Sequence, residues 1–215
     1  MKKTSIVFCL LSLGALNLLG QTARLSLHIA EKSAVHVPPQ APPAGLKKIY
    51  KNLGSKTDLY DDANAWAISG PNSAAGTHFF ALPFTPNSNA TVEQVGAALQ
   101  YSGKGANQVN LSIFSDNAGV PGTLLGGPIT VTNLPATGTC CALAVANFSP
   151  LSVTAGTRYW LVADTPLSGT GSDFKGAWAW IPKPVYLQGE NDGGGWYGFD
   201  TSPAEAATEV LGTIP

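Results

Sequence analysis

The sequence predicts an all-β protein, an antiparallel two-sheet β-sandwich with a jelly-roll-like architecture. Three observations support this fold class. Apolar residues recur with a period of two in the clearest segments, residues 94–101 and 109–113. Turn residues separate the apolar segments at short intervals, which is typical of sandwiches and barrels. The 215 residues include 24 glycines and 16 prolines, and no segment has the period of a strong amphipathic helix.

Eight segments are expected to form strands. In residues 94–101 and 109–113 the apolar residues alternate with residues such as Gln100 and Asn110, which predicts one buried and one wet face. Residues 159–163 are apolar on both faces, so they should form a central strand covered on both sides. The other strands are expected over residues 77–84, 124–131, 143–148, 174–181 and 208–214.

Two turns are expected between residues 116 and 122. Asp116 begins the run Asp-Asn-Ala-Gly, in which the aspartate can bond its own backbone and Gly119 can take a positive φ. Pro121 and Gly122 have the residue types of the second and third positions of a type II turn.

The N-terminus predicts export. Residues 1–23 form a signal peptide, with Lys2 and Lys3 ahead of an apolar run over residues 6–19 and small residues at 20–23. The apolar run is shorter than the roughly 20 residues that a membrane-spanning helix needs. The mature chain is therefore expected to be secreted or periplasmic, with no membrane span after signal cleavage.

The next segment, residues 24–48, predicts a proline-rich disordered leader, followed by one β-sandwich domain over residues 49–215. Residues 24–56 carry six cations and one acid, whereas residues 57–215 carry four cations and twelve acids. A cationic leader can dock on the acidic domain or on a polyanionic surface, but a solvated tether is the favoured interpretation. The whole chain has a net charge of −1, which argues against a nucleic-acid partner.

The mature chain has two cysteines, Cys140 and Cys141. Adjacent Cα atoms in a trans peptide lie about 3.8 Å apart, which is below the usual span of a disulfide. An oxidising compartment offers no other partner, so a vicinal disulfide that shapes a turn is favoured over two reduced thiols. A metal or redox role is the weaker alternative, because the usual thiol motifs separate the two sulfurs by two residues.

Aromatic residues provide the strongest binding signal. Trp178 and Trp180 are expected to share a strand face, and three glycines place Trp196 and Tyr197 beside a flexible loop. Flat rings on a sheet can stack on sugars, which would make these four residues a candidate ligand-binding platform. Core packing is the alternative, favoured for Trp178 and Trp180, because tryptophan is highly buried on average.

Two groups of acidic residues are weak candidates for a calcium site, because calcium prefers oxygen ligands from loops. No complete loop signature for calcium is present, so solvated turns are the favoured interpretation. No cofactor is expected, and calcium is the one alternative. The candidate ligands are Asp58, Asp61, Asp62, Glu190 and Asp192.

Three segments of the domain resemble a family of bacterial secreted proteins, the choice-of-anchor R domain proteins. They are residues 49–54 (IYKNLG), residues 109–122, which end in SDNAGVPG, and residues 150–162, which end in AGTRYWLV. The resemblance implies an extracellular β-sandwich, found with varied C-terminal sorting signals and with no established enzymatic activity. Residues 212–215 show no anchor, so plain secretion is the simpler expectation.

The sequence lacks the common catalytic signatures, including Gly-x-Ser-x-Gly, His-Glu-x-x-His and the phosphate loop. The favoured hypothesis is therefore a secreted, non-catalytic structural or interaction module with an unidentified partner. A carbohydrate-binding module for cell-surface or extracellular polysaccharide is the alternative. A glycoside hydrolase that uses a pair of carboxylates is the third hypothesis.

Overall fold

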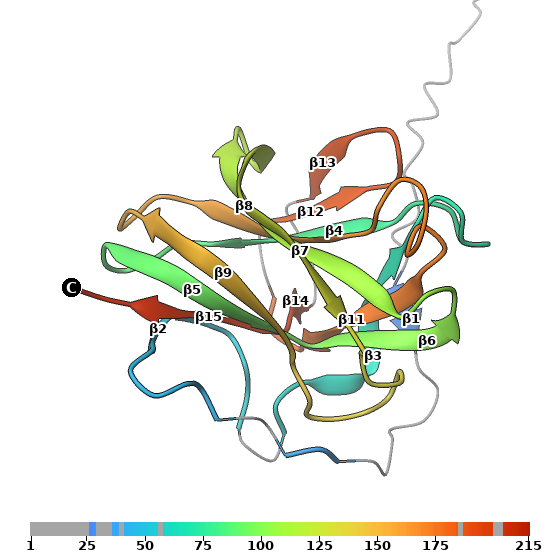
Figure 1. The fold of residues 1–215 in the computed structure, drawn as a ribbon, viewed down its shortest axis with the longest axis horizontal. Helices are drawn as coiled ribbons and strands as arrows, with labels where there is room; N and C mark the ends of the chain where they lie inside the picture. The colour runs from blue at the N-terminus through green and yellow to red at the C-terminus, as the bar shows by residue number, and fades with distance from the viewer. Residues whose placement is uncertain (1–25, 29–35, 39–40, 56–57, 185–186, 200–203) are drawn as a thin grey trace, which may run out of the picture.

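The computed structural model describes residues 26–28, 36–38, 41–55, 58–184, 187–199 and 204–215. These ranges contain fifteen strands and no helix, and the strands pair antiparallel (Figure 1). The predicted all-β antiparallel sandwich is confirmed. The predicted signal peptide lies outside the described residues.

One layer of the sandwich is a six-stranded sheet with the order β13-β12-β4-β10-β7-β8. Its central strand β10 is the segment predicted to be covered on both sides, and it pairs with β4 on one side and β7 on the other. The strands are β4 (Phe79–Phe84), β7 (Gln108–Asn117), β8 (Val120–Thr132), β10 (Tyr159–Asp164), β12 (Gln188–Asn191) and β13 (Trp196–Phe199).

The facing layer consists of two sheets that lie side by side. The five-stranded sheet contains β1 (Ser26–His28), β3 (Asp61–Ser69), β6 (Leu99–Lys104), β11 (Lys175–Ile181) and β14 (Glu205–Ala206). The four-stranded sheet contains β2 (Lys47–Lys51), β5 (Ala90–Ala97), β9 (Ala144–Val153) and β15 (Thr208–Thr213). In Figure 1 the four-stranded sheet lies at the left and the five-stranded sheet at the lower right.

Three buried alanines join these two sheets. Ala98 donates its N–H to Ala207, Ala207 donates to Ala179, and Ala179 donates to Ala98, at 2.9–3.0 Å. Ala98 lies between β5 and β6 and Ala207 between β14 and β15, so both chain segments change sheets at this junction. All three side chains are fully buried, which leaves room for nothing larger than a methyl group.

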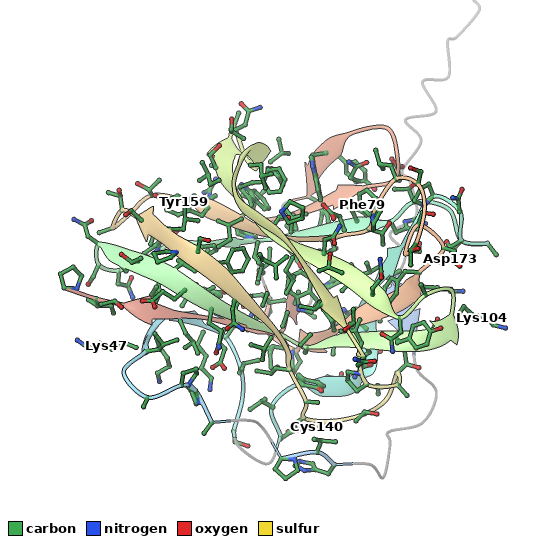
Figure 2. All side chains as sticks on the ribbon, in the orientation of Figure 1. Lys47, Phe79, Lys104, Cys140, Tyr159 and Asp173 are labelled. Carbon is green, nitrogen blue, oxygen red and sulfur yellow. A yellow bond between two sulfur atoms is a disulfide. The ribbon has the colours of Figure 1, made fainter. Side chains whose placement is uncertain are left out.

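The core between the layers is rich in aromatic rings. Trp66 of β3 stacks on Phe80 of β4 with ring centroids 5.0 Å apart, so the two layers meet directly at this contact. Phe199 lies 5.8 Å from Trp66, and Trp180 lies 5.2 Å from it on the other strand of the same sheet. Figure 2 shows side chains filling the space between the sheets.

A second, smaller core covers the outer face of the six-stranded sheet. Trp160 and Val162 point to this face, opposite to their neighbours in β10, and both are fully buried. Phe114, Leu187 and Trp196 pack against them. The Trp160 indole N–H donates to Asp116 at 2.8 Å, so Asp116 is bonded to this core, whereas a bond to its own backbone was expected.

Residues 94–101 differ from the prediction of one half-wet strand. They belong to two strands, β5 and β6, which are separated by the junction at Ala98. Ala98 and Gln100, expected on a wet face, are both fully buried. The amide of Gln100 is satisfied inside the protein, because it donates to the Thr139 carbonyl and accepts from the Gly138 N–H.

The predicted leader over residues 24–48 also differs from a disordered tether where it is described. Ser26–His28 forms strand β1 against β3. Val37 exchanges backbone hydrogen bonds with Cys140 and Cys141, and Lys47 begins strand β2. Unpaired strand edges and loops of the domain supply these partners, which proline content alone does not reveal.

The predicted turn at Pro121 and Gly122 is wrong, because both residues lie within strand β8. The chain reverses at Ala118 and Gly119, within the first expected turn, and these residues have φ angles of 52° and 91°. Two consecutive positive φ angles are the signature of the type I′ turn, whose twist matches that of the flanking strands.

Burial in the central strand predicts a large stability cost for Leu161→Ala. Leu161 is 0 % exposed, so its truncation should lower the free energy of unfolding by about 2–5 kcal/mol in urea titrations. Leu167 is 74 % exposed, and Leu167→Ala should change it by no more than about 0.5 kcal/mol. Equal effects of the two substitutions would contradict the placement of β10 at the centre of the fold.

Candidate binding site

Trp178 is part of the core and is not available to a ligand from solution. It is 0 % exposed, its indole N–H donates to the Ala207 carbonyl at 2.9 Å, and its ring meets the Phe80 ring edge-on. Core packing, the interpretation favoured for Trp178, is therefore confirmed, and its candidate place on a binding platform is wrong. The physical reason is the aromatic cluster between the layers, which the sequence spacing of Trp178 and Trp180 does not reveal.

Trp180 is half-buried and packs against the same core. Its register against β3 shifts at Ala179, and its ring lies 5.2 Å from Trp66. The indole nitrogen of Trp180 is buried and has no hydrogen-bond partner. Because its ring is committed to Trp66, Trp180 also contributes to packing between strands β3 and β11.

The hairpin between β12 and β13 carries the other two aromatic candidates. Its loop is ordered by Asn191, whose side-chain oxygen accepts from the Gly193 N–H at 2.9 Å and the Gly195 N–H at 3.3 Å. Both glycines have positive φ angles, 100° and 114°, which larger residues rarely adopt. These hydrogen bonds make the loop an ordered turn that holds the start of β13 in place.

Trp196 and Tyr197 project from opposite faces of β13, because neighbouring residues of a strand alternate. Trp196 packs half-buried beside the small outer core around Trp160. Tyr197 is half-buried and lies opposite Glu190 across the strand pair. The four aromatic candidates therefore do not form one platform, and only Trp196 presents a ring on the outer face beside the Asn191 loop.

Glu190 is a buried carboxylate on the inner face of the six-stranded sheet. Its Oε1 atom lies 3.4 Å from His78 Nδ1, and its Oε2 atom is buried without a hydrogen-bond partner. In the strand register Glu190 lies opposite Phe80, one of the stacked rings of the core. It therefore points away from the loop on which Asp192 is exposed.

The unsatisfied oxygen of Glu190 belongs to a group that sequence reasoning missed. The indole nitrogens of Trp66 and Trp180 and the side-chain oxygen of Gln188 are also buried without partners. Gln188 lies opposite Phe199, and both Phe199 and Phe80 pack against Trp66, so the four unsatisfied atoms surround one aromatic cluster. Two donors and two acceptors in such a place suit ordered water or another small polar group. No short motif signals it, because its members come from β3, β11 and β12.

The candidate calcium ligands do not form one site. Asp61 accepts from the Ala63 N–H and the Asn64 side chain at 2.9 and 2.8 Å, so its oxygens are used by a local turn. Asp58 and Asp61 line one hollow of about 530 Å³ beside Ile181, whereas Glu190 belongs to β12 of the facing six-stranded sheet. Asp62 is in β3, but its side chain lies outside the described residues.

In the part of the chain that the structure describes, carboxylates do not gather in threes close enough to share an ion. Glu190 points inward to the core, and Asp192 accepts from the Gly194 N–H within its own exposed loop. The described side chains of the weak candidate calcium ligands are therefore not brought together. Alternation along β12 explains why two nearby acids point in different directions.

A second buried carboxylate, Glu205, links strand β14 to strand β2. Tyr50 of β2 donates its hydroxyl proton to Glu205 Oε1 at 2.5 Å, and Lys183 Nζ lies 3.6 Å from Oε2. Burial, followed by the negative charge of Glu205, raises the pKa of Tyr50 well above its usual range. Tyr50 therefore stays a neutral hydrogen-bond donor, and the pair acts as a structural contact.

Asp164 has an altered acidity at the end of the central strand β10. Burial raises the pKa of Asp164 to about 6, and a hydrogen bond with Asn110 partly opposes this shift. Asn110 lies opposite Asp164 in the strand register and also accepts from the Thr130 hydroxyl. This polar group occupies the outer face of the sheet, where the sequence predicted a wet strand face.

Cys140 and Cys141 are joined by a disulfide in a loop that two buried polar side chains hold. The peptide between them is cis, and their Cα atoms are 3.2 Å apart. Gln100 donates to the Thr139 carbonyl, and the Tyr60 hydroxyl lies 2.9 Å from the carbonyl oxygens of Thr139 and Ala142. The loop is thereby fixed to strand β6 and to the start of β3.

Comparison with protein-family models and with curated proteins found no match to the chain. In the described ranges, no helix has the length and apolar character needed to cross a bilayer.

The Glu205 contact predicts a clear difference between its two partners. Tyr50→Phe leaves Glu205 buried without its shortest hydrogen bond and should lower the free energy of unfolding by about 1.5–3 kcal/mol. Lys183 is exposed, so Lys183→Ala should cost less than about 1 kcal/mol. Denaturant titration of both variants provides the measurement, and a larger loss for Lys183→Ala would show that Lys183 is the main partner of Glu205.

The raised pKa of Asp164 predicts a stability change with pH. The folded-state pKa of about 6 exceeds the ordinary value of 3.8, so the folded protein takes up this proton first and gains stability as the pH falls from 6 towards 4. Asp164→Asn removes the ionisation and should stabilise the protein above pH 6, by at most about 3 kcal/mol relative to its effect below pH 4. Urea unfolding of both proteins at pH 4 and pH 7.5 measures this difference, and a pH-independent effect of the substitution would contradict it.

Proposed function

We propose that this chain is an exported, non-catalytic β-sandwich module with a structural or interaction role. The observation that carries the proposal is the use of its carboxylates inside the fold. Glu205 binds Tyr50, Asp116 binds the Trp160 indole, and Glu209 lies 3.9 Å from Lys51. A hydrolase that uses two carboxylates needs both of them at an open cleft, free to touch substrate.

The export part of the proposal rests on the sequence of residues 1–23 and on the resemblance to choice-of-anchor R domain proteins. A disulfide between Cys140 and Cys141 is in keeping with an oxidising compartment. An extracellular module of this kind would present loops and sheet edges to its partners while the two layers keep its shape.

Carbohydrate binding at the β12–β13 hairpin is the second candidate function. It is favoured by the half-buried ring of Trp196 beside an ordered loop that contains Asn191 and the exposed Asp192. An aromatic face with neighbouring amide and carboxylate groups suits a sugar, whose ring stacks while its hydroxyls form hydrogen bonds. Such a site would be small, because Tyr197 points to the other face.

One experiment separates these functions. The full exported chain is incubated with a panel of polysaccharides, while tryptophan fluorescence reports binding and new reducing ends report hydrolysis. The structural or interaction role predicts no hydrolysis and no saturable change in fluorescence. A saturable change that is lost in Trp196→Ala and kept in Trp178→Phe, which alters a fully buried ring, would establish the carbohydrate site instead.

Hydrolysis of a polysaccharide in this panel would contradict the proposal if the activity belonged to this chain and not to a contaminating enzyme. The test is Asp58→Asn, which removes one of the two carboxylates that line the hollow beside Ile181. Loss of turnover in this variant, with an unchanged melting temperature, would identify a catalytic acid and replace the non-catalytic assignment.

A further inference from the structure

Three side chains that can bind metal meet where the leader crosses the disulfide loop. The ligand atoms of His36, Cys140 and Cys141 all lie within 4.8 Å of one another. His36 Nε2 is 3.4 Å from Cys141 Sγ. Cys140 lies on the loop at the lower edge of the view in Figure 2, below the sheets.

Backbone hydrogen bonds hold the histidine in this position. Val37, the next residue, donates its N–H to the Cys140 carbonyl and accepts from the Cys141 N–H at 3.1 Å. The other side of the loop is fixed by Tyr60 and Gln100, whose side chains bond its carbonyl oxygens. The two sulfurs and the imidazole are thus presented by backbone that is anchored on both sides.

We propose that reduction of the Cys140–Cys141 disulfide creates a binding site for a thiophilic d¹⁰ cation such as Zn²⁺, held by both thiolates and the His36 imidazole. Thiolate and imidazole are the ligands that Zn²⁺ prefers in proteins. A disulfide has no thiolate, so the oxidised protein lacks two of the three ligands. Binding is therefore controlled by the redox state of this loop.

The reductant is a thiol. Two thiol molecules supply two electrons and two protons, the Cys140–Cys141 sulfur bond breaks, and a new disulfide forms between the reductant molecules. Zn²⁺ then displaces the two protons from the cysteine thiols, and these protons pass to solvent. The product carries two Zn–S bonds and one Zn–N bond.

One separation between ligand atoms agrees with a tetrahedral zinc ion, whereas the two sulfurs are bonded to each other in the disulfide and move apart once it is reduced. Zn–S bonds of about 2.3 Å and Zn–N bonds of about 2.0–2.1 Å place neighbouring ligand atoms about 3.5–3.8 Å apart. The 3.4 Å separation of His36 Nε2 and Cys141 Sγ is close to this value. The cysteines are buried whereas His36 is exposed, so the group lies at the edge of the domain, where solvent water can supply a fourth ligand.

This inference does not depend on the proposed function, because it concerns the attachment of the leader. In the reduced, metal-bound protein, His36 would be joined to the loop by coordination bonds. The ion would then fasten the segment before β2 to the domain after the disulfide is lost.

The test measures zinc binding in both redox states by the mature chain, residues 24–215, which lacks Cys9 and has only Cys140 and Cys141 as cysteines. A phosphine reductant opens the disulfide, takes up an oxygen atom from water as its oxide and adds no competing thiol. Equilibrium dialysis followed by metal analysis then gives the zinc content, and a chromogenic disulfide reagent counts the thiols. We expect one Zn²⁺ per reduced chain and none per oxidised chain.

Two variants test the ligands. His36→Ala should keep two titratable thiols but bind Zn²⁺ at least about tenfold more weakly in competition with a chromophoric chelator. His78→Ala removes a histidine that precedes strand β4 and lies beside Glu190, outside the proposed site. This variant should bind Zn²⁺ like the unmodified chain. Alkylation of both thiols after reduction should abolish binding without requiring a new variant to fold.

Three results would overturn the proposal. The first is a reduced chain that shows two thiols but binds no more Zn²⁺ than the oxidised chain. The second is unchanged zinc affinity in His36→Ala. The third is failure of the reductant to release two thiols while circular dichroism still shows the native sheet, because the site could not then form in the folded protein.

Discussion

The ring of three backbone hydrogen bonds among Ala98, Ala179 and Ala207 is the constraint on which the rest of the fold depends. At this ring two segments of the chain leave one sheet and enter the next, so nine strands become one layer facing the other six. A bend of this kind frees backbone groups from the strand ladders, and buried groups need new partners. The three alanines provide these partners for one another, because their small side chains allow the backbones to come close.

The junction of the three alanines also affects the structural role of the tryptophans. Trp178 precedes Ala179 and its indole N–H donates to the Ala207 carbonyl, so this residue, for which core packing was favoured over a sugar platform, stabilises the bend. Trp66 and Trp180 continue the same aromatic layer towards β12. Gln188 and Glu190, each with a buried oxygen that has no hydrogen-bond partner, belong to the facing sheet and lie opposite Phe199 and Phe80 of this aromatic cluster.

The period of two predicted the sheets well, because it depends only on which residues prefer an apolar face. Strands β4, β11 and β15 lie close to their expected ranges, and the central position of β10 follows from five consecutive apolar residues. Strand β9 begins as expected but continues to Val153, five residues beyond the expected end at residue 148. Prediction failed where burial comes from a distant part of the chain. Gln100 is buried and bonded to the loop at residues 138–139, and the small core that contains Trp160 is covered by Phe114, Leu187 and Trp196.

The sequence by itself determined the fold class, the strand period, the charge asymmetry and the adjacency of Cys140 and Cys141, because these are local or compositional properties of the chain. Only the tertiary structure decided that Trp178 is buried, that Glu190 faces His78, and that His36 lies against the cysteines. Each of these contacts joins residues that are 29 to 112 positions apart, as between Trp178 and Ala207 or between His78 and Glu190. Which distant segments meet depends on sheet order and register, and these are set by the packing of the two layers as a whole.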